Sequence, residues 1–302
     1  MHLGGAFLEA NLLLKKLRTE RNLSQRKLAA DISERSTLAT FEQKGHRIAF
    51  DILYKYLDRL NVTLEEFEYH LTNNQLNEKK QLSKQFHNAY YQHDFDQLAV
   101  LIEESKTTYQ ETQDFFYYLL YSQYYLILKK KGYVHTIDET ERIETVIKGY
   151  LDKIETWGRF EITIFANLMF LFTDEYILFQ IEQLNKQEFY NNLLSLNYHI
   201  YSKLLTNAAF LFIDRSQIDH LKQILFYMTK NIPLDNDRIR LMIRYFEGII
   251  AIFHGEIETG KQTISKTIEI LNFLGQSAYA AELTELATNV LLTVAPSEEP
   301  FL

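Results

Sequence analysis

Apolar residues recur at α-helical spacing along almost the whole 302-residue chain. Clear stripes of this kind run through residues 12–17, 52–60 and 283–291. No segment shows the strict alternation of apolar and polar residues that marks a half-buried β-strand. The chain also has only 3 Pro and 10 Gly, too few for the turns of a many-stranded protein. The sequence therefore predicts an all-α fold.

Charge is distributed unevenly along this helical pattern. Residues 1–64 contain 11 Lys and Arg against 7 Asp and Glu, whereas residues 65–302 contain 21 against 33. The chain as a whole has a formal net charge of −8. A basic segment on an acidic chain is typical of proteins that contact nucleic acid through that segment alone. We therefore expect any contact with DNA to be made by the first sixty or so residues.

Two short helices joined by a tight turn are predicted within residues 22–47, NLSQRKLAADISERSTLATFEQKGHR. Ser24 is a good N-cap for a helix over 25–30, because its hydroxyl can accept from a free backbone N–H. After a turn at 31–33, a second helix over 35–44 ends at Gly45. Apolar residues on facing sides brace the pair. This is the pattern of a helix-turn-helix, whose second helix enters the major groove.

The pattern LSQ…LA…S…L…FE…G resembles the phage-repressor-like (Xre-type) family over about residues 8–68. The turn lacks the glycine often found there. The resemblance implies that Glu42 braces the domain and that Gln25 meets a backbone phosphate. Outward residues of the second helix would meet base edges, and cations around it would meet phosphates. The predicted DNA-binding residues are Gln25, Arg26, Arg35, Ser36, Thr37, Thr40, Lys44 and Arg47.

Small residues beyond the predicted helix-turn-helix indicate repeated helix pairs. Residues 248–267 reproduce the spacing of small positions in tetratricopeptide units, at Gly248, Ala251, Gly255, Gly260 and Thr267, and residues 87–99 do so more loosely. Stacked helix pairs curve into a concave binding surface. We predict a helix-turn-helix DNA-binding domain over 1–70, a polar linker over 71–80, a tetratricopeptide-like repeat domain over 81–295, and a frayed tail over 296–302.

Motifs for catalysis, metals and cofactors are not found. The absence of Cys excludes disulfides, thiol catalysis and Cys-ligated metals. Residues 255–262, GEIETGKQ, approach a phosphate-binding loop, but a helix precedes them and Gln262 replaces the required Ser or Thr. The nine His show no metal-ligand spacing. We predict no catalytic residue, no metal and no cofactor, in a protein that is not an enzyme, has no signal peptide and does not enter a membrane.

Two further stretches resemble the Rgg/MutR family of Gram-positive bacteria. Residues 150–172, YLDKIETWGRFEITIFANLMFLF, are similar to the middle of that family, and residues 245–275 to the end of its repeat domain. The shortened turn within residues 29–45 has the same family's form. The resemblance covers nearly the whole chain. It implies a cytoplasmic, homodimeric transcription factor that binds operator DNA and responds, as in quorum sensing, to a short imported hydrophobic signalling peptide.

The alternative that the residues leave open is a phage- or plasmid-type repressor with a plain helical dimerisation body and no peptide ligand. Under the peptide-binding interpretation, asparagine amides would pair with the peptide backbone, since one amide both donates and accepts. The predicted peptide-binding residues are Asn167, Asn207, Arg238 and Arg244, the arginines holding a carboxylate. The apolar stripe of the last helix is predicted to hold the dimer, through Leu283, Leu286, Val290 and Leu291.

Overall fold

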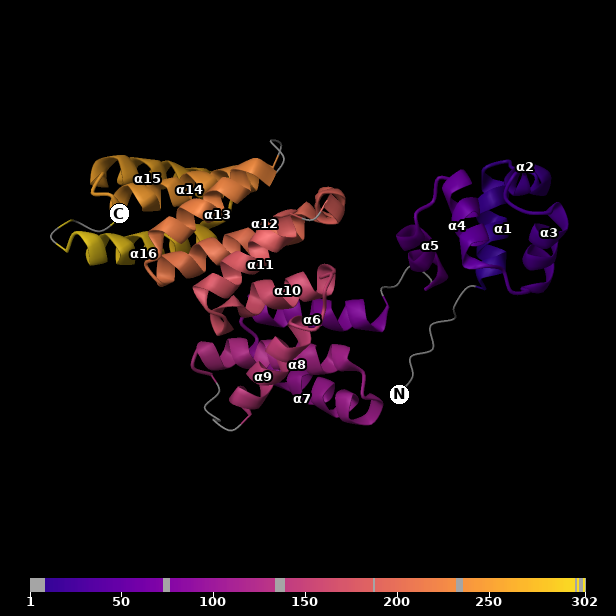
Figure 1. Ribbon diagram of the computed structural model, residues 1–302, viewed down its shortest axis with the longest axis horizontal. Coiled ribbons are helices and arrows are strands. Elements are labelled where there is room, and N and C mark those ends of the chain that lie inside the picture. Colours follow the sequence, from indigo (N-terminus) through magenta and orange to yellow (C-terminus); the bar gives the residue numbers. More distant parts are fainter. Residues whose placement is uncertain are drawn as a thin grey trace. The chain divides into compact units, whose positions relative to one another are not determined.

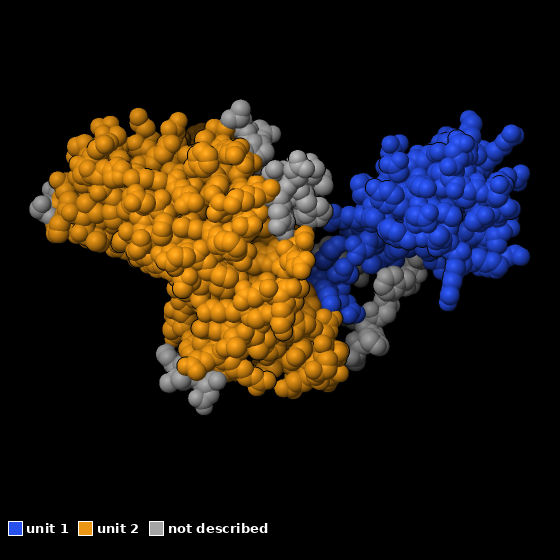
Figure 2. Space-filling view, in the orientation of Figure 1, with its two compact units in different colours: residues 1–101 blue, residues 102–302 orange. Residues whose placement is uncertain are grey.

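The computed structural model describes residues 9–72, 77–133, 139–186, 188–231, 236–296, 298 and 301, with residues 188–198 described by their backbone alone. Every regular element in these ranges is a helix, which confirms the predicted all-α fold (Figure 1). The chain divides into two compact units, Met1–Leu101 and Ile102–Leu302 (Figure 2). Each unit is described by itself below.

The first unit begins with a bundle of short helices around one apolar core. The core is built from Leu14, Leu28, Leu38, Leu57 and other buried side chains of these helices. The unit continues into α6 and the start of α7. Its helices are α1 (Ala10–Glu20), α2 (Gln25–Ala29), α3 (Arg35–Lys44), α4 (Phe50–Arg59), α5 (Leu64–Leu71), α6 (Glu78–Tyr91) and the first part of α7 (Phe95–Thr112).

The predicted helix-turn-helix is confirmed as α2 and α3, which contact each other. The Ser24 hydroxyl accepts from the backbone N–H of Lys27 at 3.2 Å and so caps α2. Gly45, at φ +64°, ends α3. Asp31 takes φ +59° in the turn between the helices, a left-handed conformation that Asp tolerates better than most residues. Asp31 therefore supplies the left-handed residue for which glycine is often used.

The predicted linker over 71–80 is short, since α5 ends at Leu71 and α6 begins at Glu78. Residues 73–76 of this stretch lie outside the described ranges. Glu68 of α5 accepts from Asn77 Nδ2 at 2.8 Å and from Lys80 Nζ at 2.8 Å. These bonds tie the start of α6 to α5. The predicted boundary at residue 80 consequently falls inside the first compact unit, whose limit is Leu101.

In the second unit, the even-numbered helices contact one another in succession: α8 with α10, α10 with α12, α12 with α14, and α14 with α16. The odd-numbered helices pack onto these. In a curved array of helix pairs, the layer whose successive helices touch has the shorter arc and lies on the concave side. We call the even-numbered helices the inner layer. The helices are α8 (Phe115–Lys130), α9 (Thr140–Leu151), α10 (Arg159–Leu168), the short 3-10 helix η1 (Met169–Leu171), α11 (Asp174–Lys186), α12 (Glu188–Asp214), α13 (Ile218–Asn231), α14 (Asp237–Phe253), α15 (Ile257–Phe273) and α16 (Ser277–Val294).

Two glycines let α14 and α15 pack backbone against backbone. A Cβ at Gly248 would lie 2.7 Å from Ile264 Cγ1, and a Cβ at Gly260 would lie 2.8 Å from the carbonyl oxygen of Gly248. Real Cβ atoms do not approach other atoms so closely. The small positions predicted from the tetratricopeptide spacing therefore mark a real close approach at this helix pair.

Candidate DNA-binding and ligand-binding sites

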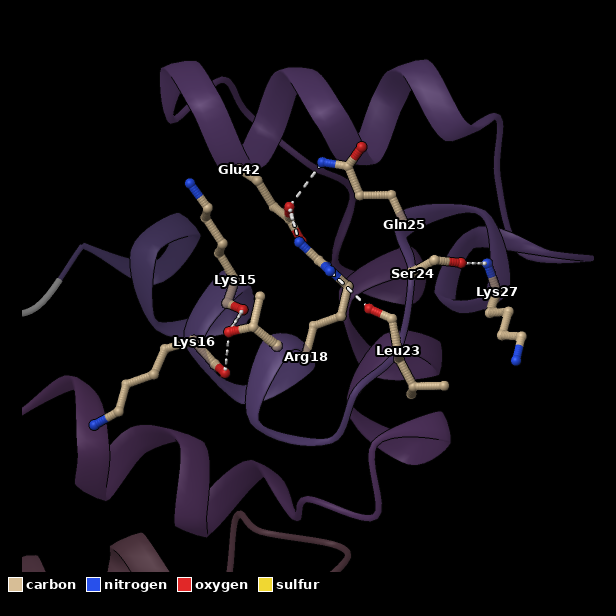
Figure 3. Close-up of polar contacts among 9 residues, drawn as sticks. Lys15, Lys16, Arg18, Leu23, Ser24, Gln25, Lys27 and Glu42 are labelled. Carbon is tan, nitrogen blue, oxygen red and sulfur yellow. Dashed lines mark hydrogen bonds and ion pairs between the residues drawn. The ribbon is translucent and has the colours of Figure 1, made fainter.

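A buried ion pair fixes the position of the helix-turn-helix (Figure 3). Arg18 of α1 donates to both carboxylate oxygens of Glu42 in α3, from Nε at 2.6 Å and from Nη2 at 2.8 Å. Its Nη1 donates to the carbonyl of Leu23 at 2.7 Å. Hydrogen bonding to Glu42 raises the pKa of the Arg18 guanidinium. The brace expected at Glu42 is confirmed, and the ion pair joins α1, α3 and the loop before α2.

A second arginine holds α2 from the other end. Arg59, the last residue of α4, donates to the carbonyl oxygens of Leu28 at 3.1 Å and Lys27 at 3.3 Å, and also to that of Ala30. These carbonyls lie at the C-terminal end of α2, where a cation also interacts favourably with the helix dipole. Sequence analysis identified neither Arg59 nor Arg18. Both act through partners far away in the sequence, and no local motif marks them.

The cations predicted to contact DNA are exposed on this bundle. Arg26, Arg35, Lys44 and Arg47 make no ion pair with any residue that the structure describes, so their charges are available to phosphates or bases. Ser36 and Thr37 are exposed in the first turn of α3, next to Arg35, and Thr40 one turn later is half-buried. This exposed surface on α2 and α3, with the residues that follow α3, is the candidate DNA-binding surface.

Gln25 differs from the other predicted DNA-binding residues. Its side chain is half-buried, and its Nε2 donates to Glu42 Oε2 at 2.9 Å. The bond adds Gln25 to the buried network of Arg18 and Glu42 (Figure 3). A phosphate contact would have to use the remaining donor of the amide, oriented by Glu42. The phosphate contact itself stays a prediction.

The two asparagines predicted to bind peptide lie on neighbouring helices of the inner layer. Asn207 of α12 donates from Nδ2 to the carbonyl oxygen of Ala166 in α10 at 2.8 Å. Asn167 follows Ala166 in α10, so the two asparagines lie on helices that contact each other. Both are half-buried. Within the described residues, the amide of Asn167 and the oxygen of Asn207 have no hydrogen-bond partner, so these groups remain available to a ligand.

The two predicted arginines lie on α14, the next helix of the inner layer, and both already interact with neighbours. Arg244 Nη1 pairs with Glu247 at 2.7 Å on an exposed part of the helix. The guanidinium of Arg238 lies 5.9 Å from the ring centroid of Tyr279 in α16. A carboxylate bound at Arg244 would compete with Glu247, which makes Arg244 a weaker candidate than an unpaired cation.

The stripe predicted to hold the dimer is used mainly inside the protomer. Leu283, Val290 and Leu291 are buried in the single chain, where α16 packs against α14 and α15, and Leu286 is half-buried. Tyr245 of α14 donates to the carbonyl oxygen of Leu283 at 2.7 Å. The apolar pattern of α16 thus reflects capping of the last helix pair. Any dimer contact through α16 must use side chains outside the buried part of the stripe.

The C-terminal end of the chain is anchored at one described point. Glu298, within the predicted tail, accepts from Lys261 Nζ of α15 at 2.8 Å.

The phosphate-loop-like stretch at residues 255–262 forms the turn between α14 and α15 and the first residues of α15, with a helix before it as expected. In the described parts of the chain, no helix is both long and apolar enough to cross a membrane.

Comparison with known proteins gives two matches that together span most of the chain. Residues 70–285 match the family described as "HTH-type transcriptional regulator Rgg, C-terminal domain", and residues 14–67 match the helix-turn-helix family. The second match contains α2 and α3, and the first contains the inner-layer asparagines.

Solved structures with the same fold cover nearly the whole chain. The SHP pheromone receptor Rgg2 of Streptococcus dysgalactiae has a TM-score of 0.71 at 20% identity, over 93% of this chain and 99% of that one. PrgX in its complex with cCF10 has a TM-score of 0.67 at 20% identity, over 93% and 99%. A Listeria monocytogenes EGD-e protein crystallised as a candidate transcriptional regulator has a TM-score of 0.76 at 21% identity, over 94% and 98%.

Proposed function

The chain belongs to the Rgg family of helix-turn-helix transcriptional regulators, and from this premise we propose that it binds operator DNA as a homodimer and that a short hydrophobic peptide controls this binding. The observation that carries the proposal is the free hydrogen-bonding capacity of Asn167 and Asn207 on two touching helices of the inner layer. An extended peptide lying across α10 and α12 would use this capacity.

The DNA-binding half of the proposal rests on the unpaired cations around α3. A dimer with twofold symmetry presents two copies of α3 to two half-sites about 34 Å apart, or a multiple of that distance. Arg35, Ser36 and Thr37 in the first turn of α3 would read base edges. Arg26, Lys44 and Arg47 would contact phosphates. Gln25, held by Glu42, would add a neutral phosphate contact.

The peptide-binding half of the proposal rests on the hydrogen bonds that the backbone of an extended peptide must form. Its backbone N–H and C=O groups lose their water on binding, and each one buried without a partner costs about 1–3 kcal/mol. The Asn167 amide can both donate and accept, and Asn207 still offers its oxygen. Two solved proteins of the same fold are the pheromone receptor Rgg2 and PrgX in its complex with cCF10. We extend peptide binding from those proteins to this chain as part of the proposal.

The proposal includes no catalytic step, and it places the protein in the cytoplasm, where both its DNA and an imported peptide would be found. For the dimer, we propose that α16 takes part through its less buried residues, Leu286 and Leu292. Truncation before Ser277 removes α16 and should then give monomers in sedimentation. A truncated protein that stays folded and dimeric would place the dimer contact on another helix.

The test of the peptide site uses a synthetic library of apolar seven- and eight-residue peptides. The full-length protein is incubated with the library, separated from free peptide, and the bound peptides are identified by mass spectrometry. The selected peptide is then titrated against the wild type and against Asn167→Ala and Asn207→Ala. We expect each substitution to weaken binding by about tenfold, the effect of one lost buried hydrogen bond.

Asn272→Ala is the matched control, because Asn272 is an exposed asparagine of α15, a helix outside the inner layer. It should bind the selected peptide as the wild type does. If the protein selects no peptide while it still binds DNA, the chain is a regulator without a peptide ligand. If both inner-layer variants fold and bind within about threefold of the wild type, less than one hydrogen bond is lost and the site lies elsewhere.

A further inference from the structure

Lys203 is an unpaired cation in the same region as the inner-layer asparagines. It lies on α12, one helical turn before Asn207, and residues four apart in a helix share a face. Its side chain is exposed, and it makes no ion pair or hydrogen bond with any residue that the structure describes. By contrast, most of the lysines that form ion pairs here, such as Lys222 with Asp219, meet a carboxylate on the surface.

The surrounding protein partly shields the ammonium of Lys203 from water. Desolvation by the surrounding protein lowers the pKa of its ammonium, although water can still reach the side chain. On a convex helix surface, an exposed lysine keeps its full hydration. The ammonium of Lys203 is therefore accessible to a ligand but less hydrated than that of a fully exposed lysine. This agrees with the place of α12 in the middle of the inner layer, between α10 and α14.

A second polar group in this part of α12 also lacks a partner. Thr206 Oγ1 is buried and makes no hydrogen bond within the described residues. A buried hydroxyl without a partner costs free energy unless a ligand or water supplies one. Lys203, Thr206 and Asn207 thus place one cation, one hydroxyl and one amide oxygen on adjacent positions of a single helix. A peptide without charged groups would need only the hydroxyl and the amide oxygen.

We propose that Lys203 binds a carboxylate of the peptide ligand and so fixes the direction in which the peptide lies across α12. This inference rests on the proposed peptide-binding function and adds the chemistry of one end of the ligand. A carboxylate suits the site because an ammonium in a partly desolvated place gains more from a charge-assisted hydrogen bond than a hydrated one does. Arg244 is less suited, since Glu247 already neutralises it.

The carboxylate could be the C-terminus of the peptide or an Asp or Glu side chain, and three libraries separate these sources. The first contains apolar peptides with free C-termini and no Asp or Glu. The second contains the same sequences as C-terminal amides. The third contains amides with one Asp or Glu. Full-length wild type, Lys203→Met and the control Lys222→Met are each incubated with every library, and the bound peptides are quantified.

We expect wild type and Lys222→Met to retain peptides from the first or the third library and to reject the second. Lys203→Met should bind the selected carboxylate peptide about tenfold or more weakly, the loss of one charge-assisted hydrogen bond. It should bind the matching uncharged peptide no more weakly than the wild type does. Retention of the free acids identifies the C-terminus as the source, and retention of the third library identifies a side chain.

Two results would overturn the inference in different ways. If wild type retains all three libraries equally, or if folded Lys203→Met keeps the preference for carboxylates, peptide binding stands and the role of Lys203 is wrong. If wild type retains none of the libraries while it still binds DNA, the proposed peptide function fails, and the role of Lys203 with it. Circular dichroism of Lys203→Met establishes that the variant is folded in either case.

Discussion

The helix-turn-helix bundle and the repeat domain differ in which of their polar side chains are paired within the chain. In the bundle, the buried charges of Arg18 and Glu42 neutralise each other and fix three segments at once, while Arg26, Arg35, Lys44 and Arg47 make no ion pair with any described residue. In the repeats, apolar and aromatic residues fill the core, and some hydrogen-bonding groups of the inner layer, such as the Thr206 hydroxyl, have no partner among the described residues. The bundle is therefore held in one shape by its buried charges, and the repeats keep the hydrogen-bonding groups that the proposed peptide would use.

The largest expected effect comes from breaking the ion pair of the bundle. Glu42→Ala leaves the Arg18 guanidinium buried without its carboxylate partner, which should destabilise the bundle by about 3–5 kcal/mol. Urea unfolding followed by circular dichroism should then show early loss of the bundle, while the repeats unfold as in the wild type. The double variant Arg18→Met, Glu42→Leu removes both charges and should recover much of the stability. Equal stability of Glu42→Ala and wild type would contradict the structural role of the pair.

The stability of the repeats should instead depend most on side-chain volume at the contact between α14 and α15. Gly260→Ala places a Cβ 2.8 Å from the carbonyl oxygen of Gly248, so α14 and α15 must move apart. Overpacking of this kind costs about 1–3 kcal/mol, and thermal unfolding of the repeats should show it. Gly149→Ala is the control, because a Cβ there meets nothing within 4 Å. It should be neutral or stabilising by up to about 1 kcal/mol. An equal response of the two variants would contradict the close approach.

Surface changes on the bundle should alter DNA binding without altering stability. Arg35→Ala should cost about 1–3 kcal/mol of operator affinity if Arg35 reads a guanine, and it should relax the sequence preference at that base. Lys44→Ala should weaken binding to all sequences alike and reduce the slope of log affinity against log salt by about 1. Fluorescence polarisation with labelled DNA at several salt concentrations measures both. Unchanged affinity of both variants would remove α3 from the interface.

The smallest expected effect concerns the ties between α5 and α6. Hydrogen bonds from Lys80 and Asn77 lower the pKa of Glu68 below its ordinary value of 4.5. The folded carboxylate therefore contributes stability above the unfolded pKa, and this contribution is lost as the pH falls through the lowered pKa. The difference in unfolding free energy between wild type and Glu68→Gln should be small near neutral pH and should vanish in acid. A difference that grows in acid would contradict the assignment.

The sequence predicted the parts of this structure that depend on local signals. Ser24 and Gly45 set the limits of the helix-turn-helix, and the spacing of Gly248 and Gly260 indicated a tightly packed helix pair. The partners of Glu42 and α2 were missed, because Arg18 and Arg59 reach them across 24 or more residues. No local pattern records such a contact.

The last helix shows a different limit of sequence analysis. The stripe at Leu283, Val290 and Leu291 was recognised, but an apolar stripe does not reveal whether its partner belongs to the same chain. In the structure, it packs against α14 and α15 of its own protomer. Lys203 was overlooked for a related reason. Its desolvation arises only in the folded protein, and no local sequence pattern marks it.

We expect a peptide bound to the repeats to change the affinity of the bundle for DNA. The most direct measurement is the affinity of the full-length dimer for an operator fragment, titrated by fluorescence polarisation with and without the peptide selected from the library. The two affinities should differ by about 5–150-fold, and DNA should change the affinity for the peptide by the same factor, because linkage is reciprocal. Identical operator affinity with and without saturating peptide would show that the peptide does not control DNA binding.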